Sequence, residues 1–238
     1  MSSKDLRKTN DSNNVDSFLQ NVASAPPVKR SGSQGRLLFA MDATASREPS
    51  WELARSLQAS MFNEVSRIGG LDVQLVYFRG YAECRASPWV NDADTLHRFM
   101  KSVRCEAGTT QIERVLTHAI KEAQANAGKQ PVGAMVYVGD CLEESIDVLG
   151  KKAGELRLLN VPVFFFQEGY EPVATRGFAQ LAKVSGGAHC RFDSASAAQL
   201  GALLRAVAVY ASGGKAALDD LKLSNDSQVR ALLEQIKA

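Results

Sequence analysis

The feature that most constrains this 238-residue chain is a short apolar run that ends in an aspartate. Residues 37–41 (Leu-Leu-Phe-Ala-Met) contain no polar side chain, and Asp42 follows directly. A strand-length run without polar alternation is typical of a central parallel strand that is buried on both faces. Open α/β sheets bind ligands at the carboxyl ends of such strands. We therefore expect Asp42, and the hydroxyls of Thr44 and Ser46 after it, at a ligand-binding edge.

Further apolar runs alternate with amphipathic helices along the rest of the chain. This βαβ pattern predicts an α/β fold with a doubly wound, mainly parallel sheet and helices on both faces. A turn at Gly80 predicts a hairpin, and hence one antiparallel edge strand. We expect strands at 71–78, 81–85, 132–138, 161–166 and 188–192, and helices at 48–68, 92–103, 145–159, 172–184 and 196–210. A further helix follows a Gly-Thr-Thr loop and ends at about residue 127.

The chain divides into one domain with two terminal appendages. Residues 36–212 are long enough for one core, whereas residues 1–35 are rich in Ser, Asn, Lys and Gly and read as a flexible leader. Residues 213–238 are predicted to form a C-terminal helical extension. Each end carries a short amphipathic helix, which either packs on the domain or recruits a partner or a second subunit. The apolar positions are Val15, Phe18, Leu19 and Val22 at one end, and Val229, Leu232, Leu233 and Ile236 at the other.

Composition excludes several classes of function. The formal net charge of +2, without a dense basic run, argues against nucleic acid as a partner. No apolar stretch reaches the roughly 18 residues that a bilayer span requires, and the first residues lack the apolar core of a signal peptide. The four cysteines are widely spaced and form no Cys-x-x-Cys pair. We therefore expect a cytoplasmic protein with reduced thiols and no membrane partner.

Two later loops add oxygen-bearing side chains at strand ends or helix starts on the same side of the predicted sheet. A Gly-Thr-Thr loop precedes one helix, and a second aspartate ends the strand at 132–138. Oxygen ligands of this kind suit a hard cation such as Mg²⁺ or Mn²⁺. The alternative is that these side chains cap helices and satisfy turns. We favour a metal site made of Asp42, Thr44, Ser46, Thr110 and Asp140.

These motifs resemble the von Willebrand factor type A (VWA) domain, a Rossmann-like fold with a metal-ion-dependent adhesion site. The resemblance rests on the order Asp-x-Thr-x-Ser, Gly-Thr-Thr and Asp, and with the order of elements and the early hairpin it covers about residues 36–210. The resemblance implies that Thr44 and Ser46 bind the metal directly and that Thr110 binds it directly or through water. It implies that Asp42 and Asp140 accept hydrogen bonds from metal-bound waters. It also implies that the open coordination position takes an Asp or Glu carboxylate from a partner protein.

Three positions depart from the family pattern. Thr44 replaces a Ser, Thr109 stands where a second Gly is common, and Cys141 stands where Gly is frequent. Relatives of this fold act as adaptor or assembly subunits, including beside AAA+ ATPases and chaperones. The resemblance therefore implies a divalent-cation-dependent protein-protein interaction module.

An enzymatic function has weaker support in the sequence than an interaction module. A phosphohydrolase with Asp42 as nucleophile needs a general acid two residues later, where Thr44 stands. The turn at 42–48 has no glycine, which excludes a nucleotide-binding fingerprint there. We predict no catalytic residue and no organic cofactor. The alternatives are a metal-dependent phosphohydrolase, or a metal-independent scaffold that acts through its terminal helices. Cys105 and Cys141 flank the later site loops, so a redox gate on the site is a further hypothesis.

Overall fold

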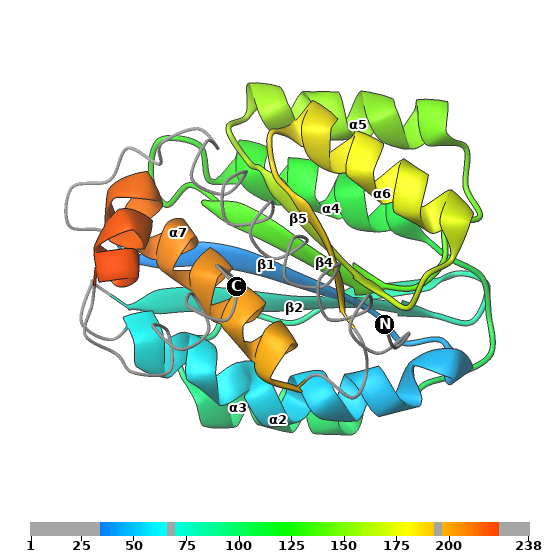
Figure 1. The fold of residues 1–238 in the computed structure, drawn as a ribbon, viewed down its shortest axis with the longest axis horizontal. Helices are drawn as coiled ribbons and strands as arrows, with labels where there is room; N and C mark the ends of the chain where they lie inside the picture. Colours follow the sequence, from blue (N-terminus) through cyan, green and yellow to red (C-terminus); the bar gives the residue numbers. More distant parts are fainter. Residues whose placement is uncertain (1–33, 66–69, 193–196, 224–238) are drawn as a thin grey trace, which may run out of the picture.

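A computed structural model describes residues 34–65, 70–192 and 197–223 (Figure 1). Within those ranges, strands form one six-stranded sheet in the order β3-β2-β1-β4-β5-β6, and every neighbouring pair is parallel except β2 with β3. The predicted fold class is therefore confirmed, including its single antiparallel edge strand. The strands are β1 (Gly35–Asp42), β2 (Leu71–Arg79), β3 (Glu83–Ala86), β4 (Ala134–Gly139), β5 (Val163–Glu168) and β6 (His189–Phe192).

Helices cover both faces of this sheet, as Figure 1 shows. Each face of the sheet packs against its own group of helices and forms its own hydrophobic core. A 3-10 turn, η1 (Ala45–Arg47), joins β1 to the first helix. One face carries α2 (Glu48–Val65), α3 (Ala93–Ser102) and α7 (Ala197–Leu223), and the other carries α4 (Ile112–Ala125), α5 (Ile146–Leu158) and α6 (Pro172–Ser185).

Strand β1 lies at the centre of the sheet because its side chains supply both cores. Leu37, Phe39 and Met41 belong to the core under α2 and α7, whereas Leu38 and Ala40 belong to the core under α4, α5 and α6. All eight residues of β1 are buried. Burial of each Leu or Phe side chain stabilises the folded state by about 1.5–3 kcal/mol relative to leaving it exposed. A position of β1 with one face exposed to solvent would lose this stabilisation.

Strand boundaries differ from the prediction by one or two residues, and those of β3 and β5 have a clear physical reason. Strand β3 begins at Glu83 rather than at residue 81, because Gly80, with φ of 57°, opens a turn that extends to Ala82. Strand β5 begins at Val163, since Pro162 has no N–H to donate, although its carbonyl still accepts from the Met135 N–H at 3.0 Å. The same strand continues to Glu168, two residues past its apolar run, and this extension places Glu168 at the carboxyl edge of the sheet.

The C-terminal helix also runs further than predicted. Helix α7 extends to Leu223, with a non-helical break at Gly214, where the sequence has Gly213-Gly214. Both predicted terminal amphipathic helices lie outside the described residues, so the leader, the extension and their roles stay predictions. Within the described part of the chain, no helix combines the length and apolarity that crossing a membrane would require.

Candidate metal centre

The turn after β1 holds two hydroxyls close together beside a buried carboxylate. Asp42 is 2% exposed, and its Oδ1 accepts a hydrogen bond from the Thr44 N–H at 2.7 Å. The Thr44 Oγ1 and Ser46 Oγ atoms lie 3.5 Å apart. Two adjacent ligands of an octahedral Mg²⁺ are about 3 Å apart, given metal–oxygen distances near 2.1 Å. The turn therefore presents the predicted hydroxyl pair in a spacing that one cation can bridge.

The Gly-Thr-Thr loop is fixed on the turn between β2 and β3. The Thr109 N–H donates to the Gly80 carbonyl at 3.2 Å, and the Gln111 Nε2 donates to the Arg79 and Gly80 carbonyls at 3.0 and 3.2 Å. A Cβ on Gly108 would overlap the backbone of Gly80. The glycine of this motif is therefore required by a close backbone approach, which brings Thr110 to the edge.

The loop after β4 is bonded to the same Thr110 segment. The Glu143 carboxylate accepts from the Thr110 N–H at 2.7 Å, and the Thr110 Oγ1 accepts from the Glu143 N–H at 3.3 Å. Glu144 accepts from the Ile112 and Glu113 N–H groups at 2.9 and 2.8 Å, so it caps α4 from another loop. Residues 109–111 and 140–144 are therefore linked into one rim of the site.

The capping alternative is correct only in part. Asp42 and Thr110 satisfy loop backbone, since Asp42 accepts from the Thr44 N–H and the Thr110 Oγ1 accepts from the Glu143 N–H. Among the described residues, however, Thr44 makes no side-chain cap bond, and the N-cap positions of α4 and α5 are Gln111 and Ser145 rather than Thr110 and Asp140. The prediction missed Glu143 and Glu144, although an acidic pair directly after the Asp140 loop was a visible signal.

Arg47 is the main site residue that sequence reasoning missed. Its side chain is 11% exposed; its Nη2 pairs with the Asp140 Oδ2 at 3.2 Å, and its Nη1 pairs with the Glu168 carboxylate. Strand alternation explains the geometry, because Val138 and Phe166, two residues earlier, face the core under α2. Asp140 and Glu168 are thus directed to the side of the sheet on which η1 and α2 lie.

Burial dominates the electrostatics at the end of β1. It raises the pKa of Asp42 to about 6, although the hydrogen bonds from Thr44 and the charge of Arg47 act in the opposite direction. Burial, reinforced by the charge of Asp42, also raises the pKa of Tyr137 well above its ordinary value. A Cβ on Gly139 would meet the Tyr137 hydroxyl at 2.8 Å, so this phenol lies directly beneath the end of β4.

Several buried polar atoms at this edge lack a partner. In the described ranges, the Arg47 Nε, the Gln111 Oε1 and the Tyr137 hydroxyl are buried without a hydrogen-bond partner. Buried polar groups are normally satisfied, so three such atoms near one edge mark it as an under-satisfied region. No three His, Cys, Asp or Glu side chains of the described residues converge on a metal position. A cation here would therefore depend on hydroxyl oxygens, and this donor set fits Mg²⁺ or Mn²⁺.

The two thiols near the site are free. Burial, together with Glu48 and Asp42, raises the pKa of Cys105 to about 12. Burial and the charge of Asp140 raise the pKa of Cys141 as well. Since the thiolate is the reactive form, both environments disfavour the predicted redox gate.

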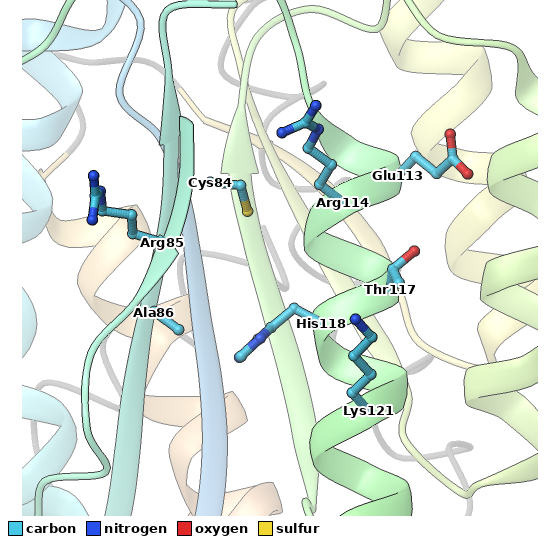
Figure 2. Close-up of a pocket in the computed structure, with 8 residues that line it drawn as sticks. All are labelled: Cys84, Arg85, Ala86, Glu113, Arg114, Thr117, His118 and Lys121. Carbon is cyan, nitrogen blue, oxygen red and sulfur yellow. The ribbon is translucent and has the colours of Figure 1, made fainter. Parts of the chain in front are cut away.

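A separate pocket of about 410 Å³ lies between β3 and α4 (Figure 2). Cys84 and His118 line it, and Figure 2 shows the His118 ring extending from α4 toward β3. The His118 Nε2 hydrogen-bonds the Gln74 Oε1 at 2.8 Å, and burial raises the pKa of Cys84. The thiol is therefore not an activated nucleophile. None of the predicted site residues lines this pocket.

No protein-family model and no curated protein sequence matches the chain. Solved structures do match it. The SpRpn10 VWA domain superposes with a TM-score of 0.56 at 11% identity, covering 68% of this chain and 89% of that one. A von Willebrand factor type A structure from Catenulispora acidiphila gives a TM-score of 0.61 at 14% identity, covering 76% of this chain and 43% of that one.

A third similar structure carries a metal. Proximal thread matrix protein 1 from the mussel byssus, with a zinc-occupied metal-ion-dependent adhesion site, gives a TM-score of 0.57 at 12% identity and covers 74% of this chain and 46% of that one. At these identities the likeness establishes the fold. The chain therefore has the fold of von Willebrand factor type A domains.

Proposed function

We propose that this chain is a protein-protein interaction module that binds a partner carboxylate through a divalent cation at the carboxyl edge of its sheet. The observation that carries the proposal is the turn after β1, where the Thr44 and Ser46 hydroxyls lie 3.5 Å apart beside the buried Asp42 carboxylate. The zinc-occupied site of the mussel protein supports it, because that protein belongs to the same group of structural neighbours.

Each predicted residue has a role in this proposal. Thr44 and Ser46 hold the cation through their hydroxyls, and Thr110, positioned by its hydrogen bonds to Glu143, adds a third oxygen directly or through water. Asp42 and Asp140 balance the charge through bound waters. The cation, when bound, supplies a positive charge that an incoming carboxylate can coordinate. The partner is a protein that offers an Asp or Glu, with a AAA+ ATPase or a chaperone as candidates.

We propose no catalytic role for this edge. The Asp42 Oδ1 is occupied by the Thr44 N–H, and position 44 carries a hydroxyl where a phosphohydrolase of this type would need a general acid. His118 and His189 each hydrogen-bond a glutamine, Gln74 and Gln167, which supports structural rather than catalytic roles for them.

Mn²⁺ binding, followed by the relaxation rate of water protons, tests the proposal. The wild type should bind Mn²⁺ and enhance relaxation, and added acetate should reduce that enhancement because a carboxylate displaces a metal-bound water. Asp42→Asn should weaken binding at least about tenfold, since it removes one of the negative charges that balance the cation. The matched control is Asp147→Asn, an exposed aspartate in the first turn of α5.

Two results would contradict the proposal. One is a wild-type protein that binds no Mn²⁺ or Mg²⁺ at millimolar concentration. The other is Mn²⁺ binding of equal strength in the wild type and in Asp42→Asn, which would place the cation elsewhere.

A further inference from the structure

We infer that Arg47 is a resident cation of this edge, and that a divalent cation binds there in competition with its guanidinium. The inference rests on the proposed function and deepens it, because it names the residue that sets cation affinity at the same site. The observations that carry it are the two ion pairs of Arg47 with Asp140 and Glu168, its burial and its fixed backbone.

The backbone of Arg47 is held on both sides. Its N–H donates to the Thr44 carbonyl at 2.9 Å, and its carbonyl accepts from the buried Ser50 hydroxyl at 3.0 Å. The side chain therefore starts from a fixed position one residue after Ser46. Unlike a mobile surface arginine, Arg47 is a fixed part of the turn after β1.

The guanidinium joins the ends of three adjacent strands. Arg47 follows β1, Asp140 follows β4, and Glu168 is the last residue of β5. The side chains of the three residues are 11%, 22% and 13% exposed, so solvent screens these ion pairs only partly. The pairs are therefore strong enough to influence any other cation at the edge.

Competition follows from the shared carboxylate. Asp140 belongs to the predicted cation site, and its Oδ2 is already directed to the Arg47 Nη2. A carboxylate that neutralises a guanidinium attracts a second cation less, and the guanidinium also repels that cation at short range in a poorly screened environment. Arg47 therefore lowers the affinity of this edge for a divalent cation.

Glu168 gives Arg47 a partner to keep when Asp140 turns toward a cation. The Nη1 of Arg47 pairs with Glu168 while its Nη2 pairs with Asp140, and its Nε has no partner among the described residues. The arginine can thus release Asp140 without becoming an unpaired buried charge. This arrangement permits exchange between an arginine-paired and a cation-paired Asp140.

Three variants test the inference with the full chain. Arg47→Gln should bind Mn²⁺ at least about tenfold more tightly than the wild type, because the competing charge is removed. Arg47→Lys keeps the charge, so its affinity should stay within about threefold of the wild type. The control is Arg55→Gln in α2. Among the described residues Arg55 forms an ion pair with the partly exposed Glu52 alone, so this substitution should not change the affinity.

A purely structural role of Arg47 predicts a different pattern. It would lower the melting temperature of Arg47→Gln in the absence of cation without any gain in Mn²⁺ affinity. A second measurement covers the case in which Arg47→Gln fails to fold. In the wild type, the Nε–H resonance of Arg47, assigned by its absence from Arg47→Lys, should shift when Mg²⁺ is added.

The failures of the two proposals are distinguishable. If Arg47→Gln binds Mn²⁺ no more tightly than the wild type, or if Mg²⁺ leaves the Arg47 resonance unmoved, the competition is refuted while the cation site stands. If the wild type and all variants bind no Mn²⁺, both proposals fail.

Discussion

The ends of β1 and β4 each place an aspartate at the same edge of the sheet, but in different environments. Asp42 is 2% exposed and accepts hydrogen bonds from Thr44, including one from its N–H. Asp140 has a side chain that is 22% exposed and pairs with Arg47. The first carboxylate is desolvated beside backbone and hydroxyl groups, and the second is compensated by a guanidinium. Asp42 is therefore the position at which an added cation would relieve the larger electrostatic cost.

The largest expected effect is on Asp42. Asp42→Asn should stabilise the cation-free protein at pH 8 by up to about 3 kcal/mol, because burial raises the pKa of this carboxyl to about 6 and so penalises its ionised form. The amide keeps an oxygen that can accept from the Thr44 N–H. Urea unfolding in EDTA measures the difference, and a loss of stability would show that the buried charge is already compensated.

The second effect is a pH dependence with a defined sign. The folded-state pKa of Asp42, about 6, lies above its ordinary value of 3.8, so the folded state holds the proton more tightly. This contribution is fully present below about pH 4 and is lost as the pH rises to about 6, with a slope of at most about 1.4 kcal/mol per pH unit. The difference in unfolding free energy between wild type and Asp42→Asn, measured from pH 4 to 8, should follow this curve. A flat difference would refute the raised pKa.

The smallest effect is expected at Asp140, and with the opposite sign. Asp140→Asn should destabilise the cation-free protein by about 1 kcal/mol, because Arg47 loses one ion pair and keeps the other with Glu168. Thermal unfolding in EDTA, beside the exposed control Asp147→Asn, measures the change. Equal signs for Asp42→Asn and Asp140→Asn would mean that the two strand ends do not differ electrostatically.

Much of the fold could be predicted because β1, β4 and β5 each contain a nearly uninterrupted apolar run. A run such as residues 37–41 has no solvent-facing side, so the parallel sheet with helices on both faces follows from it. The hydroxyls of the turn after β1 and of the loop at Thr110 could also be predicted, because each belongs to a short motif of neighbouring residues. Gly108 could be recognised as part of the Gly-Thr-Thr motif. The requirement for glycine at this position, a close approach to the Gly80 backbone, could not be predicted.

The interactions of Arg47 could not be predicted in the same way. Its partners are 93 and 121 residues away, and they come together only because β4 lies beside both β1 and β5. The prediction also ended β5 before the polar pair Gln167 and Glu168, since a hydrophobic run says nothing about polar residues that continue a strand. The cap of α4 by Glu144 was missed for a similar reason, because it comes from a different loop.

The sequence by itself determined the class of fold and the turn that carries Asp42, Thr44 and Ser46, because strand burial and turn geometry depend on neighbouring residues. Only the tertiary structure decided how the charges of that edge are paired. Strand order and register place Asp140 and Glu168 against Arg47, and Coulomb interactions depend on distance in space rather than along the chain. Tertiary structure therefore placed an arginine, absent from the predicted ligand set, in ion pairs with Asp140 and Glu168 at the edge of the candidate site.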